Sequence, residues 1–159
     1  MRRGLARRRI RLRRGGFIGR AASRAFDARR TPGYPPYVQH PFTVPVLAAG
    51  DVDARVRVRL AEIGESTSLL RHLLEPLPPG TISGALPTTG GEGIGVAESF
   101  RGDVWHWLRL DGGLIASAFA ADPSWRQWPL LEIAALDSIV ADFPLINKSF
   151  NCAYSGIDL

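Results

Sequence analysis

The chain has 159 residues with a hydrophobic share of 45%, which is enough for one domain with a single core. It contains no run of about 18 apolar residues, so the sequence predicts no membrane-spanning helix. The single cysteine, Cys152, excludes an internal disulfide and a metal cluster held by cysteines alone, and it fits a reducing compartment.

The net charge of +5 is unevenly distributed along the chain. Residues 1–30 hold 12 arginines and one acid, whereas residues 31–159 hold 8 basic and 14 acidic side chains. We therefore predict a basic, disordered tail over residues 1–15 and a folded domain over residues 16–159. No apolar core of a secretory signal follows the tail, which either stays solvated or contacts a polyanion.

The segment from residue 15 to residue 50 is predicted to be extended and largely irregular. Five prolines between residues 32 and 45 exclude a long helix, because proline lacks an amide donor and clashes with the preceding turn. We expect this segment to lie over a larger surface, with a short edge strand at Phe42–Val46.

Residues 51–74 carry the clearest helical pattern. Asp51 supplies an N-cap oxygen, and apolar residues recur at helical spacing as far as Leu74. Pro76 and the following prolines end the pattern. Arg55 and Arg59 are expected to pair with Asp51 and Glu62 along the helix.

Residues 81–92 are predicted to be a loop, and residues 95–120 an antiparallel hairpin or small meander. Gly90–Gly95 reads GGEGIG, but strand-like sequence follows it, whereas a phosphate-binding loop opens a helix, so phosphate binding is disfavoured. Within the strand at 104–110, Val104, His106, Leu108 and Leu110 share one face, and Trp105, Trp107 and Arg109 share the other. The Arg-Gly-Asp sequence at residues 101–103 is interpreted as a turn that precedes the strand.

Two short helices are expected near the C-terminus, at Trp125–Asp137 and Ala141–Phe150. Pro129 is assigned to the first turn of one and Pro144 to the start of the other, where a missing amide costs little. The predicted fold class is therefore α+β, with a long amphipathic helix, a small antiparallel sheet and short C-terminal helices.

The residues alone define no self-sufficient active site. The three histidines, His40, His72 and His106, fall in a predicted loop, helix and strand without metal-ligand spacing. No serine sits in a nucleophile elbow.

Several motifs in order resemble one known family. The long predicted helix carries GDV-x-AR-x-x-VR-x-x-EI-x-x-S from Gly50 to Ser66, followed downstream by the ESFRG of Glu98–Gly102, the DPSW of Asp122–Trp125 and the closing block Ile139–Leu159. Together they resemble the large subunit shared by NADH:quinone oxidoreductase (the 49-kDa type) and membrane-bound nickel–iron hydrogenases. The resemblance implies a fragment of the hydrogenase-large-subunit-like fold, its C-terminal portion.

The closing block departs from the hydrogenase pattern at the positions of the metal ligands. Ala153 and Gly156 stand at the two nickel-ligating cysteine positions, and neither supplies a soft, charged donor. Cys152 is one place out of register and is not interpreted as a ligand. We therefore expect no directly bound cofactor or metal. The candidate wall of the former metal or quinone cavity is Asp142, Asn151, Tyr154 and Asp158.

By resemblance, the parent complex passes electrons from NADH-type donors through iron–sulfur clusters to quinone. The implied partners are iron–sulfur and membrane subunits and the missing N-terminal half of the large subunit, at the cytoplasmic face of the inner membrane. The alternatives are a non-enzymatic assembly module or truncated remnant of that subunit and, third, a nucleic-acid binder that uses the basic tail.

Overall fold

The computed structural model describes residues 15–77, 79–85 and 88–157, so the predicted basic tail lies outside the described residues except for Gly15. The architecture mixes helices with one antiparallel sheet, in agreement with the predicted class. The helices are α2 (Gly16–Arg20), α3 (Val52–Leu74), α4 (Ser124–Ala135) and α5 (Phe143–Phe150), and the strands are β1 (Gly91–Ser99), β2 (Gly102–Asp111) and β3 (Leu114–Ala121). Single helical turns form at Arg29–Gly33, Val140–Asp142 and Ser155–Ile157.

The long helix α3 forms where the sequence predicts it. The Asp51 side chain caps it by accepting a hydrogen bond from the Ala54 amide at 2.8 Å. The helix ends at Leu74, two residues before Pro76. The expected ion pairs of Arg55 and Arg59 along the helix do not form, because both guanidiniums turn towards other elements. An i,i+4 ion pair forms instead between Asp53 and Arg57.

The sheet is a three-stranded meander in the order β1-β2-β3. Strand β1 begins at Gly91, earlier than predicted, so most of GGEGIG lies inside a strand that pairs Gly91 with Leu110 and Gly95 with His106. The glycines fit there because the ladder needs only their backbone groups. Gly112 and Gly113 take the positive φ angles that the turn to β3 requires.

The segment before α3 differs from the prediction in two places. The short helix α2 was not expected, and Phe42–Val46 is not a strand. Proline at both 41 and 45 removes ladder donors, and the Thr43 amide instead donates to Glu65 Oε2 at 3.0 Å. This segment is held against α3 by side chains rather than by a sheet.

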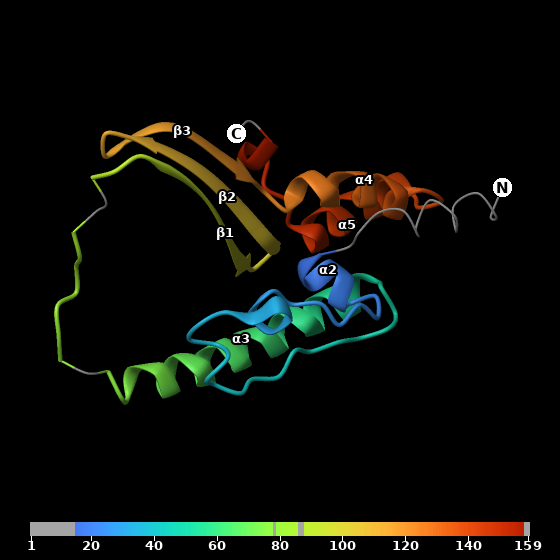
Figure 1. Cartoon of the computed structure of the whole chain (residues 1–159). Helices are drawn as coiled ribbons and strands as arrows, with labels where there is room; N and C mark the ends of the chain where they lie inside the picture. Colours follow the sequence, from blue (N-terminus) through green and yellow to red (C-terminus); the bar gives the residue numbers. More distant parts are fainter. Residues whose placement is uncertain (1–14, 78, 86–87, 158–159) are drawn as a thin grey trace.

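The core lies where α2, α3, α4 and α5 meet. Its members are Phe17, Ile18, Ala21, Ala54, Val58, Leu130, Leu131, Ile146, Phe150 and Cys152, all nine-tenths buried or more. Pro129 falls in the second turn of α4 rather than the first, whereas Pro144 opens α5 as predicted. From this corner the sheet and α3 diverge as two arms (Figure 1).

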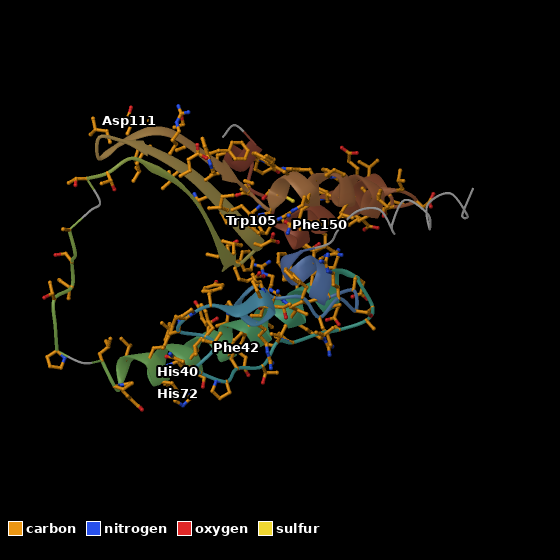
Figure 2. The ribbon with its side chains drawn as sticks, in the orientation of Figure 1. His40, Phe42, His72, Trp105, Asp111 and Phe150 are labelled. Carbon is orange, nitrogen blue, oxygen red and sulfur yellow. The ribbon has the colours of Figure 1, made fainter. Side chains whose placement is uncertain are left out.

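The two ends of β2 therefore have different surroundings. Trp105 lies near the corner and Asp111 at the far tip of the sheet, with Phe150 on the helical side (Figure 2). None of the helices in the described ranges is both long enough and apolar enough to cross a membrane.

Candidate functional site

A buried arginine lies at the vertex of the two arms. Arg20, at the end of α2, is 1% exposed. Its Nη1 donates to Glu98 Oε1 at 2.9 Å and lies 3.5 Å from Asp27 Oδ2, and its Nη2 forms an ion pair with Glu62 Oε1. One guanidinium thus joins carboxylates from the loop after α2, from α3 and from β1.

The neighbours of Arg20 complete this charge cluster. Arg29 Nε and Nη2 bind Asp27 Oδ1 and Oδ2 at 2.9 and 2.6 Å, a bidentate pair. The Ala28 amide donates to Glu98 Oε2 at 3.1 Å. The Glu98 amide donates to the Tyr34 hydroxyl at 2.9 Å. Most of these acidic oxygens therefore meet a donor, as buried charges require.

The three carboxyl groups do not share one electrostatic environment. Burial raises the pKa of Glu62 and of Glu98 above the usual range, and the attraction of Arg20 only partly offsets it. Burial also acts to raise the pKa of Asp27, but the bonds and charges of Arg29 and Arg20 outweigh it, so that pKa is lowered. Asp27 is thus the firmly ionised member of the cluster.

A pocket of about 480 Å³ opens beside the cluster. One wall is a stripe of α3 comprising Arg59, Glu62, Ile63, Ser66, Thr67 and Leu70, at spacings that share one helix face. The opposite side is Glu98, Ser99 and Phe100 at the end of β1, and Arg20 and Arg29 also line it. We call this space the α3–β1 pocket.

The C-terminal block is bonded to the turn between β1 and β2 and to α4. Arg101 Nη2 donates to Asn151 Oδ1 at 3.2 Å, and Arg101 Nε donates to the Asn151 carbonyl oxygen. Gln127 Nε2 donates to the Arg101 carbonyl oxygen at 2.5 Å. The Ala153 amide donates to Ser124 Oγ at 2.9 Å. Asn151 adopts the left-handed conformation at the end of α5, which redirects the chain into these contacts.

The two residues that the resemblance aligns with the nickel-ligating cysteines offer no donor for nickel. Ala153 and Gly156 carry no donor side chain, and a Cβ at Gly156 would lie 2.7 Å from Asp122 Cγ and 2.8 Å from its Oδ2. The space that a cysteine side chain would need is therefore filled by a carboxylate. Within residues 15–77, 79–85 and 88–157, no three His, Cys, Asp or Glu side chains group as metal ligands.

Cys152 points into the core. It is 7% exposed, and its Sγ lies 3.8 Å from Gln127 Oε1. Burial raises the pKa of this thiol to about 11, with the charge of Arg101 opposing the shift. The sulfur is therefore a protonated packing group at neutral pH.

The structure places two of the predicted wall residues, Asp142 and Asn151, at opposite ends of α5. Asp142 precedes α5 and Asn151 follows it, so the helix separates them by about 13 Å at 1.5 Å per residue. Tyr154 is 68% exposed, with its ring on Trp128 and its hydroxyl accepting from Asn147 Nδ2 at 3.0 Å. Asp158 lies outside the described residues.

The sequence interpretation did not single out Arg20 and Asp27. Glu62 and Glu98 were recognised only as members of separate motifs, 36 positions apart. The available signal was Asp27, the one acid in an arginine-rich stretch that also holds Arg20 and Arg29.

The sequence comparisons with known proteins agree on one family. The sequence profile of "Respiratory-chain NADH dehydrogenase, 49 Kd subunit" matches residues 6–90, just over half of the chain. The chain belongs to this family. It is 34% identical over 156 residues to an NADH-quinone oxidoreductase subunit of Anaeromyxobacter dehalogenans, a match that covers 90% of this chain and 41% of that protein.

The similarity also reaches a hydrogenase component and a solved respiratory complex. The chain is 30% identical over 146 residues to Hydrogenase-4 component G of Escherichia coli, covering 90% of this chain and 26% of that one. A chain of the membrane-bound sulfane sulfur reductase, an archaeal respiratory membrane complex, superposes with a TM-score of 0.84 at 26% identity, over 94% of this chain and 43% of that chain. The chain thus spans about two fifths of the length of its NADH-quinone oxidoreductase relatives.

Proposed function

We propose that the chain serves as the C-terminal section of the large subunit of a respiratory oxidoreductase complex. The complex would pass electrons from an NADH-type donor through iron–sulfur clusters to quinone, and this section would supply scaffold and one wall of a cavity. The observation that supports this role is the convergence of Glu62 and Glu98, from two separate family motifs, on Arg20.

The proposed contribution is structural rather than catalytic. Nickel has no donors at Ala153 and Gly156, and no reaction step is assigned to a metal at this chain. Among the proposed wall residues, Asn151 is held in place by Arg101, which donates to both its side chain and its backbone oxygen. Asp142, Tyr154 and Asp158 stay candidates for the same wall.

The partners are proposed to be iron–sulfur and membrane subunits on the cytoplasmic face of the inner membrane, together with the remaining part of the large subunit. The test is affinity purification of the tagged chain from its host in mild detergent, followed by mass spectrometry and iron analysis. Iron–sulfur and membrane subunits in constant proportion are the expected result. A stable, lone monomer without them would contradict the proposal.

A second candidate, a non-enzymatic assembly module, is favoured by the apolar side chains exposed along α3, such as Leu60, Ile63 and Leu70. It predicts that deleting the chain lowers the amount of complex without changing the electron-transfer rate per assembled complex. The first candidate predicts that both quantities fall.

A further inference from the structure

We propose that the α3–β1 pocket is a docking site for an acidic side chain of a partner polypeptide, which pairs with Arg59. This inference rests on the proposed function, because it identifies where the chain would hold another polypeptide of the complex. It assigns a role to a side chain that the charge cluster leaves unused.

Arg59 differs from the other arginines near the core. Arg20 and Arg29 form ion pairs with carboxylates, and Arg55 donates to Ser149 Oγ at 2.9 Å and to the Gly50 carbonyl oxygen at 2.9 Å. Arg59 is also partly buried, yet among the described residues its guanidinium has no hydrogen bond and no ion pair. A partly buried charge without a counter-ion is costly to keep, so its position calls for an explanation.

Two aromatic rings hold Arg59 in place. Phe17 and Phe100 stack with their centroids 5.1 Å apart, and the Arg59 guanidinium carbon lies 5.7 and 4.9 Å from the two ring centroids. Stacking contacts the face of a guanidinium and leaves the donors at its edge available. The fork of donors is thus oriented beforehand, which lowers the entropy lost when a carboxylate binds bidentately.

The charge of the pocket wall selects an acid over a base. Arg20 and Arg29 are paired with Glu62, Glu98 and Asp27, which leaves Arg59 as the lining arginine that has no carboxylate partner among the described residues. Both glutamates already face Arg20, and Asp27, which is bonded to Arg29, is not a lining residue. An incoming carboxylate therefore meets Arg59 without displacing an existing ion pair.

The surroundings of Arg59 fit a polypeptide better than a small carboxylate. An apolar row on α3, formed by Leu60, Ile63, Leu70 and Leu74, stays 58–63% exposed and runs for about 21 Å along the helix. This length exceeds what a small molecule in the pocket would cover. An acidic side chain flanked by apolar residues would bury the row and pair with Arg59 at once, while Ser66 and Thr67 offer hydroxyls beside it.

The test uses the tagged full chain in its host. A photo-crosslinking benzoylphenylalanine at Thr67, inside the pocket, is compared with one at Arg57, which is two residues from Arg59 and therefore points away from it. The expected result is a crosslink from position 67 to a segment of a co-purifying subunit that contains Asp or Glu, with no crosslink from position 57 to that segment. Crosslinking to a segment without an acid would overturn the proposal.

Charge reversal then tests the pairing itself. Arg59→Glu is expected to lower recovery of the partner at least about tenfold, whereas Arg57→Glu changes it less than about twofold. Replacing the crosslinked acid with arginine is expected to restore recovery with Arg59→Glu. Arg59→Met keeps the contact with the rings but removes the charge. If Arg59→Met lowers recovery of the partner as much as Arg59→Glu does, and its circular dichroism spectrum is unchanged, the loss is due to the missing ion pair and not to misfolding.

The outcomes distinguish the two proposals. Co-purification with the unchanged chain, together with undiminished recovery for Arg59→Glu or Arg59→Met, would overturn the docking site and leave the proposed function standing. Undiminished assembly without any crosslink from position 67 to a peptide would also overturn the docking site. A small carboxylate ligand in the pocket would give that result. Absence of any co-purifying subunit with the unchanged chain would overturn both.

Discussion

At the scale of single residues, Arg20 acts as a shared counter-ion. Desolvating a guanidinium is costly, and three carboxylates around it are needed to offset that cost. Because these carboxylates come from different segments, one side chain fixes how α3 and β1 approach each other. The raised pKa values of Glu62 and Glu98 show that burial still disfavours their charges.

Replacing Arg20 is therefore expected to be severely destabilising. Arg20→Met leaves three buried carboxylates without their common partner and should lower the free energy of unfolding at pH 7 by about 3–5 kcal/mol. Urea unfolding measures this loss, and the deficit should shrink as the pH falls, because protonated carboxyls need no counter-ion. Arg57→Met, which breaks an exposed pair on the same helix, should cost less than about 1 kcal/mol; a comparable loss for the two variants would contradict this assignment.

Cys152 is expected to be unreactive in the folded chain. Its pKa of about 11 lies above the usual 9.0, so its modification by a disulfide reagent at pH 8 should be about a hundredfold slower than in denaturant. The raised pKa also means that folding favours the protonated thiol. The associated stability is complete below pH 9 and is lost as the pH rises towards 11. Equal modification rates in buffer and in urea would show that the thiol is exposed.

At the scale of elements, the α2 helix and the β1–β2 turn approach each other closely at their backbones, beside the stacked rings of Phe17 and Phe100. Gly16 has a φ of +56°, and a Cβ there would overlap the carbonyl oxygen of Arg101. Gly102, with a φ of +136°, faces Gly16 from the other side. This close approach positions Arg20 beside Glu98, so the ion cluster depends on a contact that admits no side chain.

Two alanine substitutions should have opposite effects. Gly16→Ala should lower the unfolding free energy by more than about 1 kcal/mol, because the backbone must move and the φ angle is unfavourable for alanine. Gly64→Ala, inside α3 with no atom within 4 Å of the new Cβ, should raise it by about 0.5–1 kcal/mol. Thermal unfolding of both variants checks the signs. Stabilisation by both would mean that α2 does not contact the β1–β2 turn so closely.

The elements show where sequence reasoning succeeds and where it does not. The helix from Val52 to Leu74 was predictable because its cap, its period and its terminating prolines all act locally. The expected strand at Phe42–Val46 was wrong because the prediction weighed β-propensity without a partner strand. The convergence of Glu62, Glu98 and Arg20 could not be predicted, since it depends on the angle between two arms, which no local pattern specifies.

At the scale of the whole molecule, α3 and the sheet form two arms that diverge from one vertex (Figure 1). Besides the row on α3, Ile94, Trp105 and Phe119 on one face of the sheet are 72%, 44% and 51% exposed. Exposed apolar surface on this scale marks a contact with another polypeptide. The architecture is consistent with a section of a large subunit that works inside a complex.

The purified chain alone should therefore self-associate through α3. Replacing Leu60, Ile63 and Leu70 together with serine should shift sedimentation towards the monomer and reduce the fluorescence of a bound hydrophobic dye. The melting temperature should change by only a few degrees, because these side chains are largely exposed already. Replacing Leu114 and Ile115 at the sheet tip with serine is the matched control and should shift the sedimentation less. If only this control variant dissociates to the monomer, the sheet and not α3 carries the self-association.

The contact between Gly156 and Asp122 has a consequence for how this chain can change over generations. Any side chain at position 156 meets the carboxylate of Asp122, which also accepts the Ser124 amide hydrogen bond at 2.6 Å. A cysteine at position 156 therefore needs the Asp122 carboxylate to shift, against its hydrogen bond from the Ser124 amide, before the sulfur can take its place. A change of residue at position 156 is thus coupled to the position of the side chain at 122.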